Sequence, residues 1–173
     1  AAVPVLELAM ELATEVGNRK LLAAAAGNLG IVYRNMGRLD EAMTQYRLAV
    51  DVRRELQDPA GEARALGSRA VAHQEAGDVE AAQADYERSL ALARSTGDRP
   101  AEANAIGNLA TLVEECGDLA RARSLYEEGI ALHATIGDPR HLGVMVGNLA
   151  NLLIELGEVE EAGYWEPNAM VLS

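Results

Sequence analysis

Apolar residues recur along the chain at the three- and four-residue spacing of amphipathic helices, and these helical segments come in pairs. Within residues 98–137, the first segment carries Ile106, Leu109 and Val113 at this spacing and ends at Gly117. The second segment places its small and apolar residues on one side, at Leu119, Ala122, Leu125, Tyr126, Gly129 and Ile130. The pattern predicts two antiparallel helices of roughly 17 residues, each about 25 Å long.

The same pair of segments returns every forty residues. Two glycine series keep this period, the first at Gly27, Gly67, Gly107 and Gly147, the second at Gly37, Gly77, Gly117 and Gly157. Tyrosines share a third phase, at Tyr46, Tyr86 and Tyr126. A single helix pair cannot bury its apolar face, so the pairs must stack on one another. We expect the tyrosines to fill the space between neighbouring pairs and the small residues to permit close helix crossings.

The period also predicts the boundaries of the repeats. We expect the second helix of a partial repeat at 1–17, full repeats at 18–57, 58–97 and 98–137, an incomplete repeat at 138–166 and an irregular tail at 167–173. Pro167 would break the last helix. Because no polar capping helix follows, we expect a segment of a larger protein, or a tail foreign to the array. Exposed repeat ends would favour a homo-oligomer.

Composition excludes several classes of protein. The chain is 49% hydrophobic but only 3% aromatic, which favours helix over sheet and predicts an all-α fold. A net charge of −12 argues against binding to nucleic acid and to anionic membrane surfaces. The single cysteine, Cys116, excludes an internal disulfide and indicates a reducing compartment, so we expect a cytoplasmic protein.

The sequence offers no catalytic constellation. Its three histidines, His73, His133 and His141, fall in different repeats and lack the spacing of a metal site. His133 lies near the end of a second helix, where the helix dipole favours a cation. The glycines form no phosphate-binding loop after a strand. We therefore expect a protein that is not an enzyme and that has no cofactor and no metal.

The segment NLGIVYRNMGRLDEAMTQYRLAV, residues 28–50, resembles a tetratricopeptide repeat. The matching positions are Asn28, Leu29, Gly30, Tyr33, Gly37, Ala42, Tyr46 and Ala49. The forty-residue period exceeds the usual period of about thirty-four and is similar to the repeats of kinesin light chain, Pins-type adaptors and many bacterial signalling regulators. The resemblance covers about residues 1–165. It implies a right-handed superhelix, an α-solenoid of antiparallel helix pairs whose first helices line the inner surface.

In tetratricopeptide proteins a stripe along the first helices forms the peptide-binding groove. The resemblance therefore implies a groove made by Asn28, Asn35, Arg64, Ser68, Glu75, Asn104, Asn108, Thr111, Glu115, Val144, Asn148, Asn151 and Glu155. Asn28, Asn108 and Asn148 suit the backbone of an extended ligand, because an amide donates and accepts hydrogen bonds at once. The alternative is that these amides bond a neighbouring helix. Ser68 interrupts the series, and Arg64 is the one clear cation on this face.

Three acidic residues of the stripe, Glu75, Glu115 and Glu155, lie in the last turn of first helices, where the dipole disfavours acids. Their placement indicates a partner with Lys or Arg, although ordinary solvated helix formers would look the same. Arg69 stands where the other repeats have leucine. A half-buried arginine needs an acidic partner or must extend into solvent.

The sequence thus predicts a protein–protein interaction module that binds a peptide or partner helix in its groove. The alternative is a self-associating spacer array within a signalling or transcriptional regulator.

Overall fold

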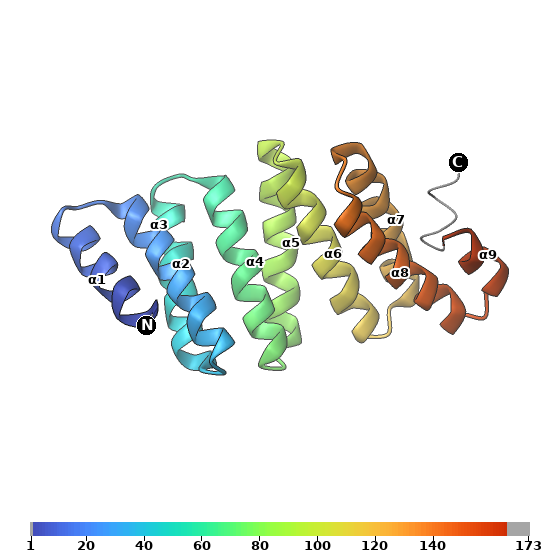
Figure 1. The fold of residues 1–173 in the computed structure, drawn as a ribbon, viewed down its shortest axis with the longest axis horizontal. Helices are drawn as coiled ribbons and strands as arrows, with labels where there is room; N and C mark the ends of the chain where they lie inside the picture. Colours follow the sequence, from blue (N-terminus) through green and yellow to red (C-terminus); the bar gives the residue numbers. More distant parts are fainter. Residues whose placement is uncertain (1, 166–173) are drawn as a thin grey trace. The chain divides into compact units, whose positions relative to one another are not determined.

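The computed structural model describes residues 2–165, and these form nine α-helices (Figure 1). Their bounds are α1 Ala2–Glu15, α2 Arg19–Asn35, α3 Leu39–Glu55, α4 Pro59–Glu75, α5 Val79–Thr96, α6 Arg99–Glu115, α7 Leu119–Ile136, α8 Pro139–Glu155 and α9 Val159–Tyr164. The expected tail at 167–173 and the helix break at Pro167 lie outside the described residues. No helix in the described range is long and apolar enough to cross a membrane.

Local sequence signals explain where the helices begin and end. The turn glycines, such as Gly37 and Gly117, have φ values between +67° and +83°, a left-handed conformation that favours glycine. Gln57 takes the same place with φ +51°. The next helix then begins at a residue whose side chain accepts a hydrogen bond from a backbone N–H two or three residues on. Asn18, Asp58, Asp78, Asp118 and Asp138 cap their helices in this way.

The chain divides into two units, unit 1 ending at Asp98 and unit 2 beginning at Arg99. In unit 1 each helix packs on the next from α1 to α5, and α2 also contacts α4. In unit 2 the sequence of contacts is α6 on α7, α7 on α8 and α8 on α9. The prediction of an all-α array of antiparallel helix pairs is confirmed.

Buried tyrosines and small residues hold the helix pairs together, as predicted. Tyr46, Tyr86 and Tyr126 are at most 1% exposed. A Cβ atom at Gly30 would lie 2.6 Å from a ring carbon of Tyr46, so only glycine lets α2 approach α3 this closely. The alanines that follow the turns, Ala42, Ala82, Ala122 and Ala162, are also buried.

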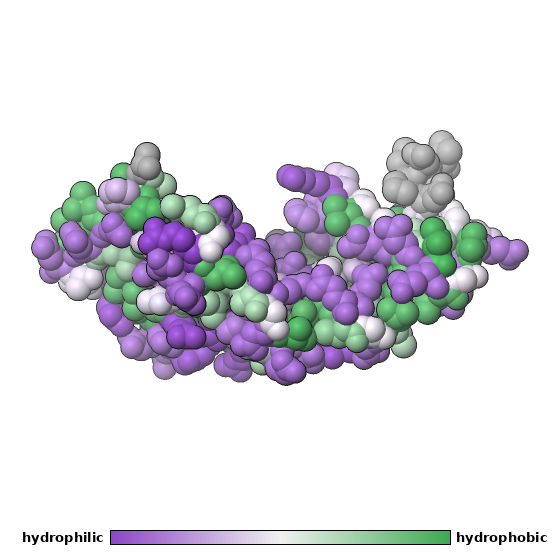
Figure 2. All heavy atoms as spheres, turned by 90° about the horizontal axis from the view of Figure 1, so that it is seen from below, coloured by the Kyte–Doolittle hydropathy of each residue, from purple (hydrophilic) through white to green (hydrophobic). Residues whose placement is uncertain are grey.

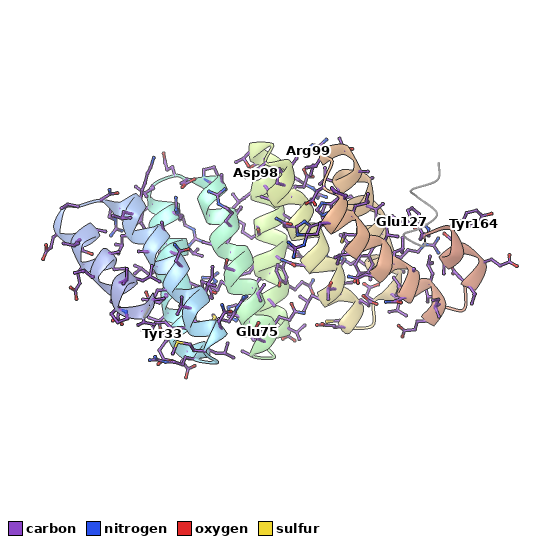
Figure 3. The ribbon with its side chains drawn as sticks, viewed as in Figure 1. Tyr33, Glu75, Asp98, Arg99, Glu127 and Tyr164 are labelled. Atoms are coloured by element: carbon purple, nitrogen blue, oxygen red, sulfur yellow. The ribbon has the colours of Figure 1, made fainter. Side chains whose placement is uncertain are left out.

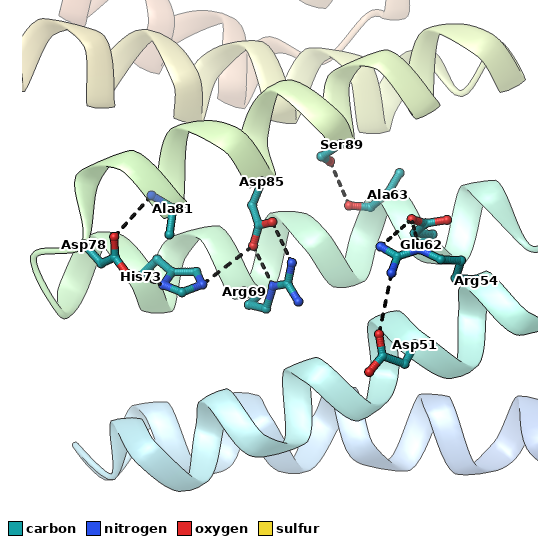
Figure 4. Close-up of polar contacts among 10 residues, drawn as sticks. All are labelled: Asp51, Arg54, Glu62, Ala63, Arg69, His73, Asp78, Ala81, Asp85 and Ser89. Atoms are coloured by element: carbon teal, nitrogen blue, oxygen red, sulfur yellow. Dashed lines mark hydrogen bonds and ion pairs between the residues drawn. The ribbon is translucent and has the colours of Figure 1, made fainter.

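The half-buried arginine in unit 1 has the acidic partner that its position requires. Arg69 of α4 donates two hydrogen bonds to Asp85 of α5, from Nε at 2.6 Å and from Nη2 at 2.7 Å (Figure 4). Asp85 is 7% exposed, and its carboxylate raises the pKa of the guanidinium. Nε2 of His73 lies 4.0 Å from Oδ2 of the same carboxylate. Forty residues later the two positions are Leu109 and Leu125, so this polar pair replaces an apolar one.

This replacement predicts the outcome of a double-variant experiment. Arg69→Leu alone leaves a buried carboxylate without its main partner and should lower the free energy of unfolding by about 3 kcal/mol. Arg69→Leu combined with Asp85→Leu restores the residues of the later repeat and should return to within about 1 kcal/mol of the native chain. Urea denaturation measures both values. A double variant as unstable as the single variant would contradict this account of the pair.

Candidate functional site

Part of the predicted stripe lines a hollow on unit 1, between the first helices α2 and α4. The hollow has a volume of about 290 Å³. Asn28 of α2 and Arg64 and Ser68 of α4 lie on its wall, and Tyr46 of α3 lies at its floor. Asn28 and Arg64 are exposed, and Ser68 is half-buried. We call this the unit 1 hollow.

A second hollow, the unit 2 hollow, lies between the first helices α6 and α8 and has a volume of about 120 Å³. Five predicted residues line it, namely Asn104, Asn108, Thr111, Val144 and Asn148. Asn104, Asn108 and Val144 are exposed, whereas Thr111 and Asn148 are half-buried. Within each unit, therefore, the structure brings predicted residues from two first helices to one depression.

The other predicted residues, Asn35, Glu75, Glu115, Asn151 and Glu155, are exposed but line neither hollow. Glu75 lies at the C-terminal end of α4, on the same edge of unit 1 as Tyr33 (Figure 3). Its Oε1 is 3.8 Å from Nε of Arg34, so a cation of the same chain already faces this acid. The sequence predicts instead that Glu75 faces a Lys or Arg residue of a binding partner.

Glycines keep the floor of each hollow low. Gly27 belongs to the unit 1 hollow and Gly107 to the unit 2 hollow. A glycine within a helix costs about 0.5–1 kcal/mol relative to alanine. A Cβ atom at Gly27 would meet only Cβ of Ala49, at 4.0 Å, which is an ordinary contact. Packing thus does not require Gly27, in contrast to Gly30, and its effect is to leave room above α3.

The buried hydroxyls of Tyr126 and Tyr46 differ in their hydrogen-bond partners. In unit 2 the hydroxyl of Tyr126 donates to Oε2 of Glu114 at 2.5 Å and lies 3.4 Å from Oγ1 of Thr111. Burial and the Glu114 carboxylate raise the pKa of Tyr126 to about 12, while interactions with Thr111 and Asn148 oppose that rise. Asn148 therefore also serves the protein's own packing, as the alternative interpretation of the asparagines had it.

In unit 1 the hydroxyl of Tyr46 lacks these partners. Eighty residues before Thr111, Glu114 and Asn148 stand Ile31, Arg34 and Ser68. The hydroxyl of Tyr46 is buried and has no hydrogen-bond partner among the described residues. A buried hydroxyl in this state costs roughly 1–3 kcal/mol. Tyr46 therefore contributes through its ring and not through its hydroxyl.

Sequence reasoning missed a second cation at the unit 1 hollow. Arg53 lines this hollow beside Arg64. Arg53 belongs to the second helix α3, whereas the predicted stripe contains only residues of first helices. Arg53 Nη1 lies 2.5 Å from Oδ2 of Asp58, and Arg64 Nη1 lies 3.6 Å from Oδ2 of Asp98. Both cations on this wall are thus paired with carboxylates of the same chain.

Two histidines that the sequence assigned to separate repeats meet in unit 2. His133 at the end of α7 and His141 at the start of α8 stack with ring centroids 5.4 Å apart, and both line the unit 2 hollow. His133 is 4% exposed, and burial lowers its pKa despite the nearby Asp138 carboxylate. Burial thus disfavours the charged imidazole that the helix dipole favours at this position. Spacing across the turn, His133 to Asp138 to His141, was the signal that was overlooked.

The family model of the tetratricopeptide repeat matches residues 1–55 and 61–135. The chain belongs to the tetratricopeptide repeat family. None of the curated protein sequences compared with it matches. Tetratricopeptide folds generally serve as protein–protein interaction scaffolds, which is the coarse function that this membership supports.

Solved structures share this tetratricopeptide fold. BtubC (BKLC) from P. vanneervenii is 22% identical, with a TM-score of 0.80 over 88% of this chain and 63% of that one. The apo form of RapI is 15% identical, with a TM-score of 0.85 over 94% of this chain and 45% of RapI. A kinesin light chain from Podosopora anserina with nearly identical TPR-like repeats is 19% identical, with a TM-score of 0.75 over 94% and 81%. The chain thus spans less than two thirds of BtubC and RapI.

The two tyrosine environments predict opposite responses to the loss of a hydroxyl. Tyr126→Phe removes a hydrogen bond to a charged acceptor and should lower the free energy of unfolding by about 1.5–3 kcal/mol. Tyr46→Phe removes a hydroxyl without a partner and should be neutral or slightly stabilising. Thermal unfolding followed by circular dichroism ranks the two variants. Equal losses in both would contradict the assignment of these hydroxyls.

Proposed function

We propose that the chain is a protein–protein interaction module that binds an extended peptide on the inner faces of its first helices. By inner faces we mean the sides of α2 and α4 in unit 1, and of α6 and α8 in unit 2, that line the two hollows. The observation that carries the proposal is the position of Asn28 and Asn108. Both amides are exposed, and each stands at the wall of a hollow between neighbouring first helices.

The chemistry of the walls suits a peptide main chain. An asparagine amide donates one hydrogen bond to a carbonyl and accepts another from an N–H, which is what an extended backbone offers. Gly27 and Gly107 keep side chains out of the floor, so a backbone can approach closely. A small-residue floor with amides at its edge favours an extended segment over a bulky helix.

Charge gives the inner face of each unit its own preference for groups of a ligand. A guanidinium has five N–H donors, so Arg53 and Arg64 can donate to a carbonyl in the unit 1 hollow while they stay paired with Asp58 and Asp98. Glu115 and Glu155 lie exposed at the C-terminal ends of α6 and α8, where they favour basic residues of the partner. We place this function in the cytoplasm, since the free, exposed thiol of Cys116 suits a reducing compartment.

Peptide selection followed by affinity measurement tests this proposal. Peptides selected from a random display library on the full chain, synthesised with a fluorophore, give dissociation constants by anisotropy. Asn28→Ala and Asn108→Ala each remove amide hydrogen bonds, and we expect the Asn28→Ala/Asn108→Ala variant to bind about five- to tenfold more weakly. Ser124→Ala, an exposed polar position on α7, is the control and should bind as the native chain does. Selected peptides that bind the double variant as tightly as the native chain would overturn the proposal.

A second candidate function, self-association as a spacer array, is favoured by one surface of α1. Its outward side carries Val5, Leu8 and Leu12, which are 66%, 54% and 49% exposed. Figure 2 shows hydrophobic residues in the open at the end of the molecule where α1 lies. Apolar side chains in a row along one helix gain free energy when a second surface covers them.

Light scattering across a wide concentration range tests self-association. We expect mass to rise with concentration in the native chain. It should stay at that of the monomer in the Leu8→Glu/Leu12→Glu variant, because a carboxylate on this face resists burial. Glu11→Gln on the same helix is the control and should behave as the native chain. A native chain that stays monomeric throughout removes this candidate and leaves peptide binding untouched.

A further inference from the structure

We propose that His133, Asp138 and His141, at the turn from α7 to α8, form a binding site for a divalent metal ion of the zinc class. Imidazole nitrogens with one carboxylate oxygen are a ligand set that zinc accepts in proteins. All three residues belong to unit 2. The site does not depend on peptide binding, because every ligand comes from the chain itself.

The ligand atoms already lie close to the positions that one ion requires. Nδ1 of His141 is 2.6 Å and Nδ1 of His133 is 3.8 Å from Oδ2 of Asp138. One ligand atom from each of the three residues lies within 4.8 Å of the other two. Tetrahedral zinc with bonds of about 2.0–2.2 Å places its ligands about 3.3 Å apart. The two distances from Oδ2 bracket this value, so small rotations of exposed or turn side chains would complete the site.

A buried nitrogen in need of a partner points into this cluster. His133 is 96% buried, and its Nδ1 has no hydrogen-bond partner among the described residues. Such a group costs free energy unless something satisfies it, and a metal ion would do so. Asp138 accepts at Oδ1 from the backbone N–H of His141 at 3.2 Å, and its Oδ2 lies 2.6 Å from Nδ1 of His141. A bound ion would replace this second hydrogen bond by two metal–ligand bonds.

The same turn eighty residues earlier shows what the carboxylate prefers at this place. There Arg53, Asp58 and Gly61 stand where unit 2 has His133, Asp138 and His141. Arg53 sets its guanidinium against the capping carboxylate, with Nη1 2.5 Å from Oδ2. A Cβ atom at Gly61 would crowd the side chains of Asp58 and Arg53, so glycine leaves room for this ion pair.

In unit 2 the imidazoles of His133 and His141 stand where unit 1 has Arg53 and Gly61. A bound metal ion would restore the positive charge beside the capping carboxylate. Three protein ligands leave a fourth coordination position to water or to another ligand. Since both histidines line the unit 2 hollow, that position is available to a molecule entering the hollow.

Isothermal titration of Zn²⁺ into the full chain, without an affinity tag, tests the site. We expect one ion per chain, with affinity at least about tenfold lower in His133→Ala and in His141→Ala. The His141 side chain is 51% exposed, so its variant should fold normally even if His133→Ala disturbs the core. His73→Ala removes the histidine of unit 1 and is the matched control, with affinity unchanged.

Nitrogen chemical shifts of the histidine rings give an independent readout. On addition of Zn²⁺, the Nδ1 signals of His133 and His141 should move together and saturate at one equivalent, while those of His73 stay in place. Absence of saturable binding, or binding that both His133→Ala and His141→Ala retain, would overturn the metal site. Neither result bears on peptide binding, which Asn28→Ala and Asn108→Ala report separately.

Discussion

The contact between Gly30 and the ring of Tyr46 sets how closely α2 and α3 approach, and much of unit 1 depends on it. The ring is fully buried, and a single added carbon at Gly30 would overlap it. The same tyrosine also lines the unit 1 hollow. Tyr46 therefore both packs α2 against α3 and lines the unit 1 hollow, in which we place the ligand. Since a lone helix pair cannot cover its own apolar face, such contacts must recur from one pair to the next.

Repetition fixes the scaffold, while substitutions at equivalent positions vary its chemistry. Tyr126 donates to a carboxylate, Tyr86 donates to the amide oxygen of Gln74 at 3.1 Å, and Tyr46 has no partner among the described residues. At the turns, a guanidinium beside one capping carboxylate becomes a pair of imidazoles beside another. Membership of the tetratricopeptide family accounts for the shared positions. Specific binding must come from the positions that differ.

The sequence predicts the fold well because its signals are local. Turn glycines, capping residues and helical spacing each act within a few residues, so the helix pairs follow directly from them. It also predicts that Arg69 needs an acid, but not that the acid is Asp85, which lies on another helix. Arg53 was missed for the same reason, because its place at the hollow depends on how α3 packs against α2 and α4. The histidine cluster was missed although its residues span a single turn, because the repeat boundary between His133 and His141 separated them.

The location of a bound ligand is the most direct test of this account. A crystal structure of the full chain with its tightest selected peptide would show it. We predict that the peptide main chain lies on an inner face, with Asn28 in unit 1 or Asn108 in unit 2 within hydrogen-bond distance of a backbone atom. A peptide bound only to the second helices α3, α5 or α7, away from both asparagines, would contradict the assignment of the inner faces as the binding surface.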